Sequence, residues 1–536
     1  MDWARNLLFI GVVVGGLTTL AANLLPPSEP APVSQYDAPS YREQDFRLTV
    51  VRADNAFRKD WDEKSLNHSE LATNLIQIRR VALGLMGTIP SLEEIRQIEA
   101  LPADQQMPWW IDHVLKDQRF HDYFGERLAR AFVGTEDGPF LQYRRRRFVT
   151  WLSEQVARNK PYDGIVRELI AGDGLWTDHP ATNFITVTVR PEMKNEPDPV
   201  RLAGRVTRAF LGIRLDCAQC HNHPFTEWKQ ADFHGLSAFF AQAHLGFRGI
   251  QDGDGAYEAE DRYTKTKSVI EPSVPFLKEH LPANGARRDR LAAWVTHPKN
   301  EFFARSTVNR VWAIMCGKPL VEPIDNLEPG VQIPVPLQIL ADDFAANGFN
   351  LHRLIRLIAS SEAFRLDSAS KYEVGEKEEK AWAVFPLTRL RPEQVAGSVL
   401  QAASISTINA ETHITIRLLR QIERSNFVKR YGDTGEDEFE GRGGTIPQSL
   451  LRMNGELVRD RIGGSPVNAS TRISLVAPND PKAVEVAYLT ILSRRPTPKE
   501  TTYFEQFLNE PGLGRSDKLA DIYWALINST EFSWNH

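Results

Sequence analysis

The chain has 536 residues, of which 42% are hydrophobic and 25% charged, and its formal net charge is −5 with histidine neutral. This composition is typical of an ordinary globular protein and excludes the collagenous, disordered and polytopic membrane classes. The nearly balanced charge gives no electrostatic reason to bind nucleic acid. Three cysteines are too few for a disulfide framework in a chain of this length.

The N-terminus carries an apolar segment that indicates export. Leu7–Leu25 contains no charged residue and follows Arg5. About 20 apolar residues span the hydrocarbon of a bilayer, so we expect residues 1–25 to be a signal anchor or a signal peptide. The positive-inside bias then places the body in the periplasm or cell envelope, anchored to the inner membrane, or secreted if the segment is cleaved. Residues 26–66 begin with closely spaced prolines, which predicts a Pro-rich tether.

The rest of the chain is dominated by helical patterns. Ser91 and Glu94 have the spacing of a capping box, which predicts that a helix begins there. Apolar residues recur at helical spacing over 75–85, 110–132, 148–156, 164–170, 302–312, 337–344 and 351–358. Only Phe184–Val189 has the β-branched character of a strand. The predicted fold class is mainly α, a helical two-domain body with long loops and little sheet.

The predicted domain boundaries follow from the polar, Gly-rich stretches. We expect an N-terminal domain over 67–250, a polar connecting loop over 251–285 and a C-terminal domain over 286–536.

The strongest chemical signal is the C-x-x-C-H motif formed by Cys217, Cys220 and His221. In this spacing two thiols attach haem through thioether links and the adjacent imidazole binds its iron. The motif therefore predicts haem c, with Cys217 and Cys220 as anchors and His221 as the axial ligand. Attachment of this kind takes place outside the cytoplasm, in agreement with the N-terminal segment. Candidates for the opposite axial position are Met193, which we favour, and His223, His234, His244 and Met315.

Two other interpretations of the same residues stay open. Cys217, Cys220, His223 and His234 together offer four ligands of the kind that hold a tetrahedral zinc. The two thiols could instead be a redox pair, a local disulfide or simply buried.

The segment before the motif predicts a helix with an arginine face. Asp198-Pro199 is a cap followed by a first-turn proline, and Leu202, Val206, Phe210 and Ile213 form an apolar stripe. Arg201, Arg205 and Arg208 lie on another face, where they contact either haem propionates or solvent. Further along, Arg305 and Arg310 are expected to pair with the loop that carries Asp325.

The motif and its surroundings resemble a large family of exported planctomycete proteins of unknown function, often joined to cytochrome-c-like domains. The residues that carry the resemblance are Phe210–Phe225, Trp228–Asp232 and Ala238–Phe240, together with Phe303–Trp312, Pro447–Gly455 and Trp524–Phe532 in a C-terminal partner domain. The resemblance implies an exported protein and a possible second secreted protein, encoded nearby, as a partner. Where many relatives carry a cytochrome-c domain, we expect this chain to carry the N-terminal anchor and the Pro-rich tether. Where relatives often have Tyr-Tyr after Asp, this chain has Asp232-Phe233-His234.

These signals together predict an exported, membrane-tethered c-type monohaem protein that acts in electron transfer or as a redox partner. One alternative is a non-redox assembly or binding protein of the cell envelope, with structural zinc or a thiol cluster at the same residues. A third is an envelope enzyme acting on polymeric carbohydrate. The chain has no G-x-S-x-G elbow, H-E-x-x-H pair or P-loop, so the sequence reveals no substrate.

Overall fold

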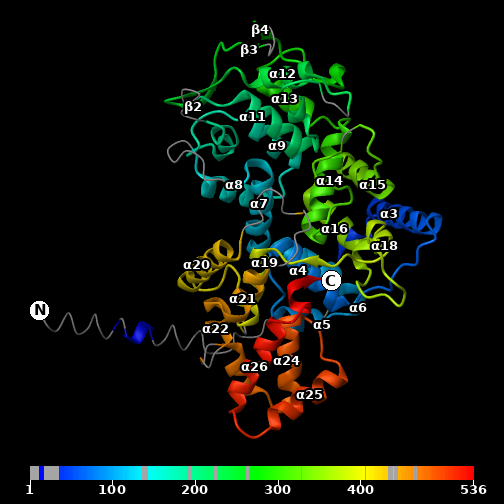
Figure 1. The fold of residues 1–536 in the computed structure, drawn as a ribbon, viewed down its shortest axis with the longest axis vertical. Helices are drawn as coiled ribbons and strands as arrows, with labels where there is room; N and C mark the ends of the chain where they lie inside the picture. Colours follow the sequence, from blue (N-terminus) through cyan, green and yellow to red (C-terminus); the bar gives the residue numbers. More distant parts are fainter. Residues whose placement is uncertain are drawn as a thin grey trace, which may run out of the picture.

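The computed structural model describes residues 11, 13–16, 35–135, 143–189, 196–222, 226–260, 265–327, 329–404, 406–432, 439, 445–462, 465 and 468–536. These residues form an elongated body that is mainly α-helical, as the sequence predicts (Figure 1). Most of the expected signal segment lies outside the described residues. None of the described helices has both the length and the apolar character needed to cross a bilayer.

The first third of the chain folds into helices, among which α4 packs against α6 and α7. Their bounds are α2 Pro39–Arg42, α3 Gln44–Glu63, α4 Asn74–Met86, α5 Leu92–Glu99, α6 Ala103–Val114, α7 Gln118–Val133, α8 Arg145–Ala157 and α9 Tyr162–Ala171. The capping box is confirmed: the Ser91 hydroxyl accepts from the Glu94 amide, and the Glu94 carboxylate accepts from the Ser91 amide. The periodic pattern over 110–132 is divided between α6 and α7, with Asp117 capping α7.

Short helices and hairpins form the part of the molecule that carries the C-x-x-C-H motif. They are η1 Pro180–Thr182, α10 Asn183–Thr186, α11 Pro199–Val206, η3 Thr207–Leu211, η4 Leu215–Ala218, α12 Gln230–Ser237, η5 Ala238–Phe240 and η6 Lys278–His280. The antiparallel hairpins are β1 Ala243–Gly246 with β2 Gly249–Asp252, and β3 Tyr257–Glu260 with β4 Lys267–Ile270. The expected connecting loop over 251–285 therefore contains paired strands.

The strand expected at Phe184–Val189 is wrong, because α10 occupies its first residues. The whole segment is buried, so its β-branched residues pack on several sides rather than on one face of a sheet. The side-chain amide of Asn183 donates to the nearby Pro180 carbonyl at 2.8 Å, which favours a turn. The backbone amide of Arg144, from a distant part of the chain, donates to Asn183 Oδ1 at 2.8 Å. Tertiary contacts here outweigh strand propensity.

The second half of the chain continues the helical body. Its elements are α13 Arg287–Val295, α14 Glu301–Cys316, α15 Val335–Ala346, α16 Leu351–Ser360, α17 Glu362–Arg365, α18 Glu376–Lys380, α19 Pro392–Ala402, α20 Ile414–Tyr431, α21 Ile446–Asn454, α22 Glu456–Ile462, α23 Ala469–Val476, α24 Asp480–Leu492, α25 Pro498–Asn509, α26 Arg515–Ile527 and η7 Glu531–Ser533. A last pair of strands, β5 Thr388–Arg389 and β6 Trp534–Asn535, runs antiparallel. Helices α24–α26 lie at the end of the body opposite α12 and α13 (Figure 1).

Two hydrophobic cores hold the body together. The first core extends along the sequence from Phe46 to Phe385, and so crosses the expected domain boundary near residue 286 without a break. The second core combines Leu390 and later residues with Leu83, Ile89, Leu92 and Ile95. Helix α4 is shared, because Ile78 and Leu85 belong to the first core while Leu83 belongs to the second.

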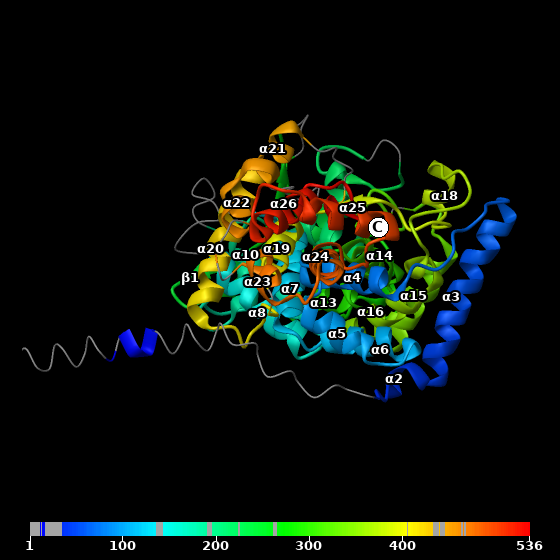
Figure 2. The ribbon, with the colours of Figure 1, turned by 90° about the horizontal axis from the view of Figure 1, so that it is seen from below.

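Helix α3 lies within the segment expected to be a tether. It packs along α15 and α16 at the edge of the body (Figure 2). Phe46, Phe57 and Trp61 on its inner face are each at most 3% exposed. These residues recur at helical spacing and bury apolar surface, which is why the segment folds onto the body although proline-rich residues precede it.

Candidate functional site

The C-x-x-C-H motif follows directly from a capped helix. The Asp198 carboxylate accepts from the Val200 and Arg201 amides and so fixes the start of α11, as the sequence predicts. The helix widens into the π-helical turn η3 and ends at Gly212, whose φ of +64° is a left-handed conformation that favours glycine. The chain then forms the 3-10 turn η4, which contains Cys217.

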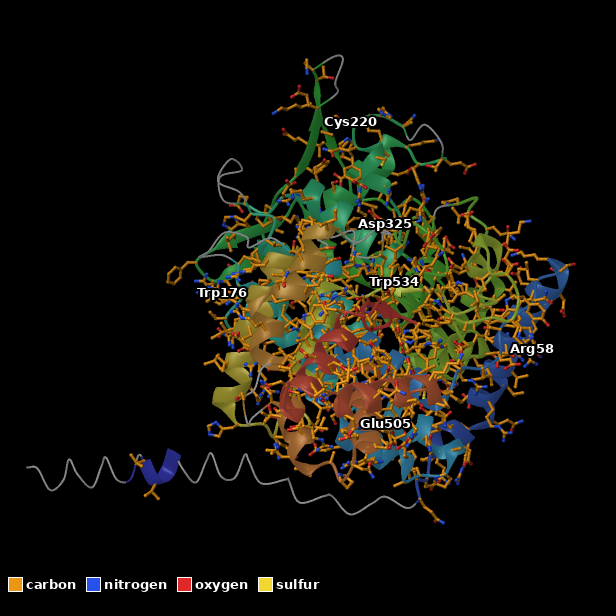
Figure 3. All side chains as sticks on the ribbon, turned by 60° about the horizontal axis from the view of Figure 1, so that its bottom comes forward. Arg58, Trp176, Cys220, Asp325, Glu505 and Trp534 are labelled. Atoms are coloured by element: carbon orange, nitrogen blue, oxygen red, sulfur yellow. The ribbon has the colours of Figure 1, made fainter. Side chains whose placement is uncertain are left out.

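Both thiols of the motif lie at the surface. Cys217 and Cys220 are exposed and are not joined in a disulfide, whereas the third cysteine, Cys316, is buried. Figure 3 shows Cys220 near the outer edge of this part of the molecule, with Asp325 nearer to its centre. The motif is therefore open to a large planar group or to a partner.

The His221 imidazole is exposed, and one of its nitrogens is already engaged. Its Nδ1 lies 2.7 Å from the Asn222 carbonyl oxygen. A carbonyl only accepts hydrogen bonds, so Nδ1 carries a proton, and Nε2 is the nitrogen that this contact leaves for another partner. This arrangement presents Nε2 as a metal ligand, with the second nitrogen held by the backbone.

Ion pairs connect the motif to a distant loop. Arg208 donates to Asp216 at 2.7 and 3.0 Å, and Arg214 donates to Asp325 at 2.7 and 2.9 Å. The hydrogen bond that Arg208 donates to Asp216 raises the pKa of Arg208, and the one that Arg214 donates to Asp325 raises the pKa of Arg214, with a contribution from Cys217 in both cases. Both guanidinium groups therefore lie near the Cys217 sulfur.

This pairing corrects one expectation. Asp325 pairs with Arg214, and its carboxylate lies 3.7 Å from the Arg208 guanidinium. It does not pair with Arg305 or Arg310 of α14. Arg305 instead donates to Gln338 at 2.6 Å and pairs with Glu301. Helix α14 carries Arg305 one turn from Glu301, so the local pair forms in place of the distant one.

A groove of about 650 Å³ lies beside the motif. We call it the arginine groove, because the arginines that line it are Arg130, Arg201, Arg205, Arg208, Arg214 and Arg310. Helices α7 and α11 form one wall, and α14 with the loop over 319–325 forms the other. Gln219, between the two cysteines, also lines it. The arginine face predicted for α11 therefore borders a groove rather than open solvent.

The residues proposed for zinc are only partly described. His223 lies outside the described residues, as does Met193. The ring of His234 approaches the backbone of Gln219, its Nδ1 lies 2.8 Å from the Tyr257 hydroxyl, and burial lowers its pKa. Among the described residues, Cys217, Cys220 and His234 do not bring three ligand atoms within 4.8 Å of one another.

Two other candidates for the distal haem position have ordinary roles. His244 Nδ1 pairs with Glu196 at 2.6 Å. Met315 is 1% exposed and belongs to the first core.

One cluster that the sequence analysis missed has metal-ligand geometry. Glu94, His113 and Asp117 bring their ligand atoms within 4.8 Å of one another. Arg119 already occupies the centre of this cluster, since its Nη2 contacts Glu94 and lies 2.6 Å from Asp117. Burial opposes ionisation of Glu94, but Arg119 outweighs it and lowers the pKa to about 2. The guanidinium neutralises the site, which is an internal ion-pair network.

Two segments of the chain match models of known families. Residues 52–244 match PSCyt2, described as a protein of unknown function (DUF1549), and residues 287–414 match PSD1, described as a protein of unknown function (DUF1553). No curated protein and no solved structure matches the chain. The two walls of the arginine groove come one from each matched segment, so the groove forms where the two segments meet.

Proposed function

We propose that this chain is an exported, membrane-tethered c-type monohaem protein that acts in electron transfer. Cys217 and Cys220 form the thioether links and His221 is the axial ligand. The observation that carries the proposal is the C-x-x-C-H sequence held at the surface, with both thiols exposed and outside any disulfide. Its resemblance to exported planctomycete proteins, often joined to cytochrome-c-like domains, supports it.

The residues present fit a haem group in three respects. The exposed thiols leave room for a macrocycle to approach. The His221 ring leaves Nε2 available to iron, and the backbone carbonyl of Asn222 orients the ring. Arg208 and Arg214 lie near the Cys217 sulfur, and their ion pairs with Asp216 and Asp325 fix the segment that carries it.

When bound, haem supplies a one-electron couple that amino-acid side chains lack. The surface position of the motif suits exchange of an electron with a redox partner. Residues 1–25 anchor the body to the inner membrane, and Met193 is the proposed distal ligand. Zinc at Cys217, Cys220, His223 and His234, in a non-redox envelope protein, is the rival assignment of the same residues.

The test is expression of the full chain in the periplasm of a host that matures c-type cytochromes. We expect a Soret band and a pyridine haemochrome corresponding to one haem per chain. Both signals should vanish in the double variant Cys217→Ala, Cys220→Ala and persist in Cys316→Ala, which removes the buried thiol as a matched control. Colourless protein that holds one zinc per chain, lost in the double variant, would refute the haem assignment.

A further inference from the structure

We propose that the arginine groove binds a ligand bearing an oxyanion, namely a carboxylate, sulfate or phosphate group, through Arg310 and Arg201. This inference goes beyond the proposed function and does not depend on haem attachment. It rests on the charges that line the groove and on which of them are already neutralised.

Arg310 is the central observation. Its side chain is 8% exposed, and its Nε is buried without a hydrogen-bond partner. Among the described residues, no carboxylate lies within ion-pair distance of its guanidinium, although Arg310 lines the groove. An unpaired buried cation is costly to a fold, whereas an anion bound in the groove would remove that cost.

Other arginines of the groove are already engaged. Arg130 pairs with Glu126 at 3.1 Å and with Glu393 at 2.8 Å. Arg208 and Arg214 pair with Asp216 and Asp325. These pairs neutralise the positive charges of Arg130, Arg208 and Arg214. They also hold the residues that line the groove in place.

Arg201 supplies a second available cation. It is partly exposed on the first turn of α11, and no described carboxylate pairs with it. Arg201 belongs to the first family-matched segment and Arg310 to the second, so a ligand held by both would bridge the segments. Guanidinium groups bind carboxylate, sulfate and phosphate through paired hydrogen bonds, which matches a ligand with oxyanion chemistry.

The size of the groove indicates more than an inorganic ion. A volume of about 650 Å³ lies within the roughly 300–1,000 Å³ of small-molecule sites. The oxyanion has two sources: the propionates of a haem attached beside Gln219, or a free anionic molecule. Both present the same chemistry to Arg310 and Arg201, and the experiment separates them.

The first arm uses the full chain with Cys217→Ala and Cys220→Ala, to which no haem can attach. Isothermal titration with sodium sulfate and with sodium citrate, against sodium chloride at equal ionic strength, should give saturable binding at one site. Arg310→Gln and Arg201→Gln should each weaken binding by about tenfold or more, as expected for the loss of a charge-assisted hydrogen bond. Arg305→Gln, on the same helix but engaged with Glu301 and Gln338, is the matched control and should bind as the parent does.

Circular dichroism shows whether each variant folds. Arg201 is partly exposed, so we expect Arg201→Gln to fold and to test the site even if Arg310→Gln does not fold. No saturable binding, or equal binding by the Arg201→Gln and Arg305→Gln variants, would overturn the proposal. The second arm repeats the titration on haem-loaded protein. Loss of sulfate binding there identifies propionates as the natural occupant, and retained binding identifies a free anion. If haem never attaches, the first arm still decides the groove, so the two proposals can fail separately.

Discussion

Glu393 offers the sharpest test of the ion-pair network behind the groove. Its Oε1 accepts from Arg127 at 3.0 Å and from Arg130 at 2.8 Å, and Arg127 is fully buried. Burial opposes ionisation of Glu393, but the two arginines outweigh it and lower the pKa from 4.5 to about 2. Replacing the carboxylate by an amide, Glu393→Gln, keeps the shape and leaves two cations without their shared anion.

The pKa of Glu393 sets the expected magnitude. A fall from 4.5 to about 2 corresponds to about 3 kcal/mol of stability at pH 7, at about 1.4 kcal/mol per unit. Because the folded-state pKa is depressed, this stability is complete above pH 4.5 and is lost as the pH falls toward 2. At pH 3 we expect about 1.5 kcal/mol to remain.

Urea unfolding followed by tryptophan fluorescence measures the difference between the parent and Glu393→Gln at both pH values. Glu70→Gln is the matched control, since Glu70 pairs with Lys371 on the surface and should change stability little. A difference that is the same at pH 7 and pH 3, or below about 1 kcal/mol at pH 7, would show that the Glu393 carboxylate does not stabilise the fold in this way.

Three further substitutions test local features. Gly84→Ala would place a Cβ 2.7 Å from the Met315 carbonyl oxygen, where α4 meets α14, and should cost about 2 kcal/mol in urea unfolding; an unchanged midpoint would contradict this close approach. Ser91→Ala removes the capping box of α5 and should cost about 1 kcal/mol, measured in the same way, and Ser91→Asp should restore most of it. Asp325→Asn breaks the pair with Arg214 and should cost about 1 kcal/mol, because Arg214 is partly exposed; the loss should shrink in 1 M salt, and a loss independent of salt would argue against an ion pair.

Features set by neighbouring residues could be predicted from the sequence. The capping box at Ser91 and the start of α11 at Asp198 each depend on atoms within three residues, and both are confirmed. The arginine face of α11 follows from helical spacing in the same way. In contrast, the β-branched composition of Phe184–Val189 predicted a strand, and the structure has a helix there. The prediction failed because burial by residues distant in the sequence leaves no local signal.

Features built from distant segments could not be predicted. The partner of Asp325 is Arg214, 111 positions earlier, and many arginines were equally available in the sequence. The arginine groove exists only because α11 and α14 pack on opposite sides of it. The isolation of Arg310 likewise depends on which carboxylates the fold brings near.

The sharing of α4 between the two cores constrains how the newly made chain reaches its final form. Leu83 and Ile95 are synthesised early, yet they complete a core whose other members, such as Leu519 and Phe532, emerge from the ribosome hundreds of residues later. Until those residues arrive, the early helices keep an apolar face uncovered. The second core can therefore form only after the C-terminal helices are made, and neither half of the chain can bury its apolar surface by itself.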